Sequence, residues 1–370
     1  MYKRQFPYIC GKNGGAAFIV IYLLCLLGLG LPILICEYAI GRGSNKSLGS
    51  AFKMLSPEGT RWHHFRWVAY AGNYLLMMFY TMVAGWMLNY FVYSLTGQLS
   101  GKNVEQIGGE FNNMLSTPSV MIFWTLVVVV ISILVCSLGL QKGVEKISKV
   151  MMILLFALMI IMAVNSLLLD GSSEGLKFYL VPDFSKMREQ GIGNVVFAAM
   201  SHAFFTLGLG IGSMEIFGSY LSRDCKLTGE SINVVILDTV VALTAGIIII
   251  PACFAYGINP GAGPSLLFIT LPNVFNQMPG GVIWEVLFFI FMAFAALSTV
   301  IAVYENIIAM TMDLFNCSRK RASLVNLFVI SVLCMPAVLG YNVLSGVQPL
   351  GAGTTIMDLE DFLVSYNILP

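Results

Sequence analysis

Long unbroken runs of apolar residues, separated by short polar linkers, dominate the chain. The runs 120–140, 150–169 and 282–310 each reach the roughly 18–20 residues that a helix needs to cross a bilayer. Because lipid offers no partner to backbone N–H and C=O groups, a spanning segment must be a helix or part of a closed barrel. The runs are continuous instead of alternating in polarity, which excludes a barrel. The pattern therefore predicts an all-α integral membrane protein.

Polar linkers divide this pattern into a series of predicted helices. A short helix covers 5–12, a last helix begins near 358, and 264–277 is expected to form a short helix at the membrane face. The predicted spans are 16–40, 66–95, 119–139, 146–169, 193–218, 229–256, 282–314 and 322–341. No linker is long enough for a soluble domain, so 1–370 is interpreted as one transmembrane domain. Both ends stop within the helical pattern, and we expect the domain to be truncated at both.

Basic residues distinguish the two sides of the membrane. The linkers that follow spans 16–40, 119–139, 193–218 and 282–314 carry thirteen Lys and Arg, and the alternate linkers carry four. Since cytoplasmic linkers are enriched in Lys and Arg, the first set, including the loop 41–66, is predicted to be cytoplasmic. The linkers 97–118, 170–192 and 258–281 then become outer loops, the last containing the short helix. This predicts a multi-pass protein of the cell's inner (plasma) membrane.

The composition excludes several other classes. Charged residues make up 11% of the chain, against about a quarter in a soluble domain. A net charge of +1 gives no basis for nucleic-acid binding, which leaves membrane lipid and a small solute as the expected partners; the oligomeric state is not indicated. The eight cysteines form no CxxC pair and are interpreted as small buried hydrophobes. With only His63, His64 and His202 available, no nucleophile–base or metal constellation converges, so neither an enzyme nor an organic cofactor is expected.

Five acidic residues fall inside predicted spans, where an ionisable group is costly and usually faces a cavity or a partner. For four of them, a hydrogen-bonded structural carboxylate is the favoured interpretation. Asp238 differs because it lies deep in an otherwise apolar helix, and there a functional role is favoured. The five are Glu37, Glu215, Asp238, Glu285 and Glu305.

The segment 201–218 combines Thr206 and two phenylalanines with four glycines, at 208, 210, 212 and 218. Each glycine inside a helix costs about 1 kcal/mol relative to alanine, so the helix is expected to unwind here. Broken helices in transporters expose backbone groups to ions and substrate near the midplane. Close helix packing through small residues explains the glycines equally well. The neighbouring Phe204, Phe205 and Thr206 favour a binding site.

A second polar cluster, Ser298 and Thr299, lies in the middle of the long apolar span 282–314. Hydroxyl and carbonyl oxygens are suitable ligands for a hard cation. Ordinary hydrogen bonding between helices explains such residues more often, so the cluster alone does not establish an ion site.

Taken together, several motifs resemble one known family. These are QFPYICGKNGGAAF, GLPILICEYAIGRG, GLQKGVEKISKVMM, AFFTLGLGIG, PSLLFITLPNVFNQMPGG and FAALSTVIAVYE, which follow one another along nearly the whole chain. They are similar, in this order, to the neurotransmitter:sodium symporter family. The short loops and the Asp-Thr pair at 238–239 are similar to its prokaryotic branch.

The resemblance implies a LeuT-like inverted-repeat helix bundle, present here from the second half of the first helix to the start of the tenth. It also implies symport of two sodium ions with an amino acid. The residues that match the family's substrate positions are Leu76, Tyr80, Phe205, Thr206, Gly208, Ile211, Thr299 and Val303. Thr206 and Asp238 match the first sodium site, and Ala295, Ser298 and Thr299 the second. Among them Tyr80 would bind the substrate carboxylate, and Phe205 would cover the substrate.

Four positions depart from the family pattern or refine it. Asp238 stands where relatives have asparagine and would supply a fixed negative charge. Ala242 stands at the chloride-binding serine of some relatives, so the Asp238 carboxylate could replace that anion. The family's outer gate pairs an arginine with an acid, and here the matching residues are Gln5 and Asp361.

The leading hypothesis is therefore sodium-coupled symport of a neutral, hydrophobic amino acid by alternating access. A sodium-independent amino-acid carrier of the same fold is one alternative, which would not need the set Thr206, Asp238, Ser298 and Thr299. A non-transporting fragment or sensor is another, suggested by the two truncated ends.

Overall fold

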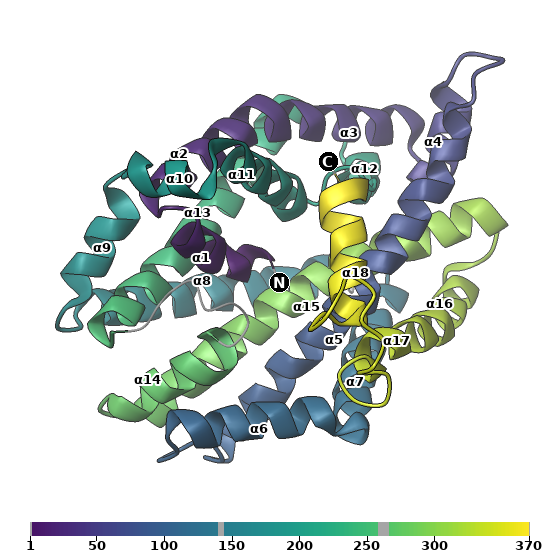
Figure 1. Ribbon diagram of the computed structural model, residues 1–370. Helices are drawn as coiled ribbons and strands as arrows, with labels where there is room; N and C mark the ends of the chain where they lie inside the picture. Colours follow the sequence, from purple (N-terminus) through teal and green to yellow (C-terminus); the bar gives the residue numbers. More distant parts are fainter. Residues whose placement is uncertain (1, 140–143, 258–265, 370) are drawn as a thin grey trace.

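The computed structural model describes residues 2–139, 144–257 and 266–369, and the side chains of 2–5, 8, 186 and 266 lie outside this description. Within these residues all regular structure is helical (Figure 1). Seven helical stretches are long and apolar enough to cross a membrane. The helices of these stretches are α2 (Ala16–Cys25) continuing into α3 (Leu31–Ser44), α5 (Phe65–Leu95), α7 (Pro118–Ser137), α8 (Lys146–Leu167), α13 (Leu227–Ala255), α15 (Gly281–Phe315) and α16 (Arg319–Leu333) continuing into α17 (Met335–Leu339).

Most predicted spans agree with these helices to within about four residues, the margin expected for boundaries read from a sequence. One span is not a single helix. The predicted span 193–218 is two helices, α11 (Ile192–Leu207) and α12 (Ser213–Tyr220), with a non-helical linker between them. A π-helical turn at Leu26–Gly30 joins α2 to α3, which the apolar pattern did not indicate.

The linkers contain short helices that the apolar pattern did not reveal, because each is too short or too polar to stand out. These are α4 (Leu48–Leu55), α6 (Val104–Ser116), α9 (Ser172–Leu180) and α10 (Phe184–Gln190). The expected short helix at 264–277 consists of a π-helical turn at Leu266–Thr270 and α14 (Leu271–Gln277). Part of the predicted loop 258–281 lies outside the described residues. The ends of the chain form α1 (Tyr2–Lys12) and α18 (Ile356–Leu363).

The long helices α5 and α15 cross the middle of the bundle and pack against each other (Figure 1). The helices α3 and α12 also pack closely, and glycine makes this possible. A Cβ on Gly41 would lie 2.0 Å from the carbonyl oxygen of Glu215, and a Cβ on Gly218 would lie 2.7 Å from Cα of Tyr38. Gly218, the last of the four glycines in 201–218, therefore serves helix packing.

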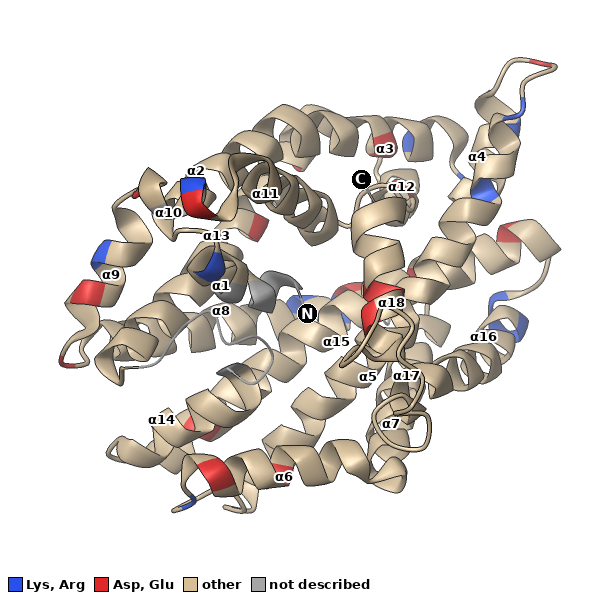
Figure 2. Ribbon diagram, in the orientation of Figure 1, with Lys and Arg blue, Asp and Glu red and all other residues tan. Residues whose placement is uncertain are grey.

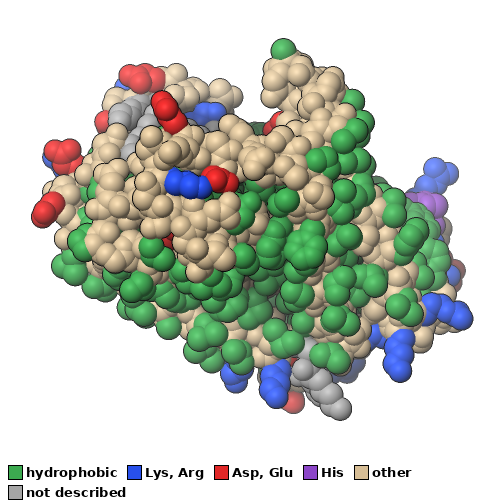
Figure 3. Space-filling model, turned by 90° about the horizontal axis from the view of Figure 1, so that it is seen from below, with side chains coloured by type: hydrophobic (Ala, Val, Ile, Leu, Met, Phe, Trp, Pro, Cys, Tyr) green, Lys and Arg blue, Asp and Glu red, His purple; other side chains and the backbone are tan. Residues whose placement is uncertain are grey.

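The outer surface fits a lipid environment. Charged residues lie mostly near helix ends and in linkers (Figure 2). Figure 3 shows a broad band of hydrophobic side chains between acidic groups at the upper left and basic groups along the lower and right edges. Large apolar side chains are mostly exposed on several spans, for example Ile160 on α8 and Phe328 on α16.

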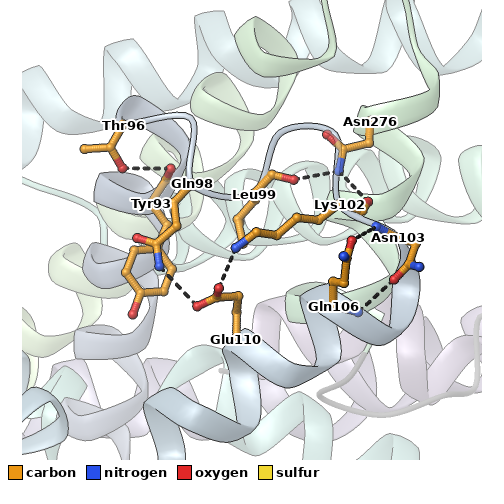
Figure 4. A network of polar contacts seen from close by, with 9 residues as sticks. All are labelled: Tyr93, Thr96, Gln98, Leu99, Lys102, Asn103, Gln106, Glu110 and Asn276. Carbon is orange, nitrogen blue, oxygen red and sulfur yellow. Dashed lines mark hydrogen bonds and ion pairs between the residues drawn. The ribbon is translucent and has the colours of Figure 1, made fainter.

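A polar network ties the linker after α5 to α14 (Figure 4). The Asn276 side chain donates hydrogen bonds to the backbone carbonyls of Leu99, at 2.7 Å, and Lys102, at 3.1 Å. Lys102 forms an ion pair with Glu110 of α6, and Gln98 donates to the same carboxylate at 3.1 Å. We call these five residues the loop network.

Candidate functional site

Three glycines break the helix between α11 and α12. Gly208, Gly210 and Gly212 have φ angles of 66°, 88° and 73°. A residue with a side chain adopts this left-handed region only at a cost of roughly 1–2 kcal/mol. At Gly210 a Cβ would also lie 2.6 Å from the carbonyl oxygen of Leu369. The expected unwinding is confirmed, and its cause is the backbone conformation at these three positions.

A partly buried carboxylate holds two N–H groups of the break. Oε1 of Glu37, on α3, accepts a hydrogen bond from the Gly210 N–H at 2.7 Å, and Oε2 accepts from the Met214 N–H at 3.3 Å. Met214 lies in the first turn of α12, where N–H groups have no partner within the helix. A negative group is favoured at such a helix start. Glu37 is therefore a hydrogen-bonded structural carboxylate, the interpretation that the sequence favoured for it.

The last turn of α11 meets α13 at the predicted first sodium site. The Thr206 hydroxyl donates to Oδ2 of Asp238 at 2.8 Å, and the Asp238 residue is 5% exposed. The Tyr22 side chain, on α2, lies beside both residues. Leu237, which precedes Asp238 in the chain, is 51% exposed and faces away from the bundle. The structure thus brings the oxygen atoms of Thr206 and Asp238 together in a partly buried setting.

The predicted second sodium site lies on one stretch of α15. The hydroxyls of Ser298 and Thr299 both donate to the carbonyl oxygen of Ala295, at 3.0 and 3.2 Å. All three residues are partly buried. The three predicted ligands are adjacent, but these hydrogen bonds are local ones within the helix.

The apolar pocket positions come from three elements that meet at the break. Leu76 and Tyr80 of α5, Ile211 of the break and Val303 of α15 are each 5% exposed or less. A Cβ on Gly72 of α5 would lie 3.0 Å from Cγ2 of Ile211, so the Ile211 side chain lies against α5.

Apart from Thr206, the remaining three substrate positions lie on or beside these elements. Phe205, in the last turn of α11, is 9% exposed, and Gly208 begins the break. Thr299 belongs to the same α15 segment as Val303.

A cavity of about 440 Å³ lies between α1, α11 and α18, and Asp361 lines it together with Lys12, Asn13 and His202. The Ser365 hydroxyl donates to Asp361 Oδ1 at 2.7 Å. The side chain of Gln5, the other predicted gate residue, lies outside the described residues. The pairing of Gln5 with Asp361 stays a prediction.

Sequence reasoning missed two asparagines that contact the break. Asn73 of α5 and Asn306 of α15 are fully buried, and both donate to the carbonyl oxygen of Ile211, at 2.8 and 3.4 Å. An amide inside an apolar span was the available signal, since a buried polar group needs a hydrogen-bonding partner.

The other intramembrane acids divide into two kinds. Glu305 receives two hydrogen bonds from the Arg319 guanidinium, at 2.7 and 2.8 Å, and one from the Tyr220 hydroxyl at 3.0 Å. It is a structural ion pair, as the sequence favoured. Glu215 and Glu285 are buried, and within the described residues neither Glu215 oxygen nor Oε1 of Glu285 has a hydrogen-bonding partner.

Comparison with known proteins shows the family to which the chain belongs. The model of the sodium:neurotransmitter symporter family matches residues 4–117 and 110–358. The chain belongs to this family. The uncharacterized sodium-dependent transporter YhdH of Bacillus subtilis is 36% identical over 99% of this chain and 80% of its own length. A sodium- and chloride-dependent taurine transporter of Bos taurus is 26% identical, over 98% of this chain and 65% of its own length.

A solved structure shares the whole arrangement. The crystal structure of MhsT in complex with L-phenylalanine is 38% identical and superposes with a TM-score of 0.90, over 99% of this chain and 82% of that chain. The expected LeuT-like fold is therefore confirmed. As a member of the symporter family, the protein is a multi-pass, sodium-dependent transporter and not an enzyme.

Proposed function

We propose that this symporter-family protein couples sodium to the uptake of a neutral, hydrophobic amino acid by alternating access. The observation that carries the proposal is the hydrogen bond from Thr206, at the end of a broken helix, to the buried Asp238. A carboxylate removed from water is costly unless it meets a cation. The pair supplies oxygen ligands, which suit sodium.

In this proposal both backbone groups and side chains at the break bind the substrate and the ions. The unwound residues 208–212 and the start of α12 present backbone groups near the bundle centre, as broken helices do in transporters. Tyr80 would hold the substrate carboxylate, Phe205 would cover it, and Thr299 would stand between substrate and the second sodium at Ala295 and Ser298. Gln5 and Asp361 would close the outer side.

The apolar character of the pocket supports a hydrophobic side chain as the substrate feature. Leu76, Ile211 and Val303 carry no charge, and Gly208 leaves room where a larger residue would not. The similar protein MhsT was solved with L-phenylalanine, which fits the same chemistry. Basic linkers such as 41–66 would face the cytoplasm.

Sodium coupling is tested by uptake. The protein, expressed from its native gene and reconstituted in vesicles, is expected to accumulate labelled phenylalanine with sodium outside and to lose this uptake in potassium or choline. Equal uptake in all three salts would support the sodium-independent carrier instead.

The substrate class is tested by competition. With the twenty amino acids as competitors, large apolar and aromatic ones should inhibit phenylalanine uptake most strongly. Preferential inhibition by glutamate, lysine or glycine would show that the pocket positions are wrongly assigned.

A further inference from the structure

Two buried amides meet at a single backbone carbonyl in the centre of the bundle. The Asn73 side-chain amide donates to the carbonyl oxygen of Ala69 at 2.7 Å and to that of Ile211 at 2.8 Å. The Asn306 amide donates to Asn73 Oδ1 at 3.0 Å and to the Ile211 carbonyl at 3.4 Å. Both residues are 0% exposed. We call Asn73, Asn306 and the Ile211 carbonyl the amide clamp.

The clamp joins the three elements that form the apolar pocket. Leu76 follows Asn73 by three residues on α5, and Val303 precedes Asn306 by three residues on α15. Residues with this spacing lie on the same face of a helix. The third pocket side chain belongs to Ile211 itself, whose carbonyl receives both amides. Each element therefore carries a clamp group one turn or less from its pocket side chain.

The side-chain N–H donors of both amides are committed to this arrangement, whereas Oδ1 of Asn306 is buried and has no hydrogen-bonding partner among the described residues. Asn73 uses both N–H donors, and its oxygen accepts from Asn306 at 3.0 Å and from the Ser213 hydroxyl at 3.4 Å. Asn306 uses both of its donors as well. Because the carbonyl lies in an unwound segment, no helical N–H holds it, and such bonds are stronger in a dry interior than in water. The α5 and α15 backbones are thus held at a fixed separation around Ile211.

We propose that Asn73 and Asn306 are positioning residues that set the width of the substrate pocket and so its selectivity for side-chain size. The inference rests on the proposed function, because it takes Leu76, Ile211 and Val303 as the pocket. Neither asparagine touches the substrate in this account. They act by holding the Ile211 backbone between the two helices, so that the pocket neither widens nor closes.

The experiment compares Asn306→Ala and Asn73→Ala with Asn89→Ala in the whole protein reconstituted in vesicles. Asn89 is a matched control because it is a buried asparagine on the same helix, α5, far from the break. Asn306→Ala is the milder variant, since it leaves the Ile211 carbonyl its shorter hydrogen bond from Asn73. Inhibition of labelled phenylalanine uptake by unlabelled phenylalanine and by valine reports selectivity for size.

Both clamp variants should raise the KM for phenylalanine by about fivefold to tenfold. This change corresponds to the net free energy of one or two hydrogen bonds. The ratio of the phenylalanine and valine inhibition constants should fall towards one, while the maximal rate and the sodium concentration for half-maximal uptake stay close to those of the unmodified protein. Asn89→Ala should leave the ratio unchanged.

Two outcomes would overturn the inference. One is a selectivity ratio that stays constant while uptake falls uniformly, which is the result of a general loss of stability. The other is a failure of both clamp variants to yield folded protein, which would assign the asparagines to the fold alone. The proposed function fails separately, if the unmodified protein shows no sodium-dependent uptake of an apolar amino acid.

Discussion

Single side chains acquire their roles from the places where they are buried. Asp238 and Leu237 are neighbours in the sequence, yet Asp238 is 5% exposed and bonded to Thr206, whereas Leu237 is 51% exposed. A shift of one residue turns a side chain by about 100° around a helix. The matched position in α13 therefore holds the carboxyl group of Asp238 and not an apolar side chain.

Asp238→Asn is expected to raise the sodium concentration for half-maximal uptake by about tenfold or more, because a charged ligand interacts more strongly than a neutral one of the same shape. Uptake by the unmodified protein should not change when gluconate replaces chloride, since the carboxylate already supplies the negative charge. Both are measured as uptake into vesicles over a sodium series.

Glu285→Gln is a suitable control for Asp238→Asn, because Glu285 is an equally buried acid outside the proposed site. An unchanged sodium dependence in Asp238→Asn, or a chloride requirement in the unmodified protein, would contradict the role given to Asp238.

Among the elements, the broken helix depends on glycine most directly. The sequence of the glycine-rich segment 201–218 permitted two explanations, unwinding and close helix packing, and both occur in the structure. Gly208, Gly210 and Gly212 adopt positive φ angles in the break, and Gly218 lets α12 approach α3. The backbone groups released at the break are held by Glu37 on one side and by the amide clamp on the other.

Gly210→Ala is expected to lower the thermal unfolding temperature and to abolish most uptake. The native backbone at this position is left-handed, which costs a residue with a Cβ roughly 1–2 kcal/mol, and the new Cβ would lie 2.6 Å from the Leu369 carbonyl oxygen. Gly109→Ala is the control, since Gly109 lies in α6 and an added Cβ would have no atom within 4 Å. This substitution should stabilise the protein by about 0.5–1 kcal/mol. Tryptophan fluorescence on heating in detergent measures the unfolding temperature of both variants, and vesicle assays measure their uptake. Equal unfolding temperatures and equal uptake in the two variants would contradict this account of the break.

On the scale of the whole molecule, the loop network fastens the linker after α5 to α14. Asn276 makes its hydrogen bonds with backbone groups of that linker, so the link depends on a single side chain more than on sequence in the linker itself (Figure 4). The network is partly open to water, and its ion pair is therefore a small contribution to stability.

Asn276→Ala should increase the hydrogen-exchange rate of backbone amides in 97–103 and 271–277 while the unfolding temperature stays nearly constant. Asn273→Ala, on the same helix and without a hydrogen bond to the linker among the described residues, is the control. If the exchange rates of the linker respond equally to both variants, the network does not hold the two segments together.

The sequence by itself determined the class of protein, the membrane spans and the family motifs. Apolar runs of sufficient length can only be spanning helices, because an unsatisfied backbone group in lipid is too costly, and this constraint is local to each segment. It predicted the spans closely but left the linker helices and the π-helical turn at Leu26–Gly30 unrecognised, because their stability comes from contacts with distant segments.

Only the tertiary structure decided which residues share the site. Asn73 and Asn306 are 233 residues apart in the chain, and nothing near either one indicates that both reach the Ile211 carbonyl. The same holds for Thr206 with Asp238 and for Glu37 with Gly210, whose pairing follows from how α3, α11 and α13 cross. Hydrophobic periodicity specifies which face of a helix is buried, but the partner of a buried polar group depends on the packing of other helices against that face.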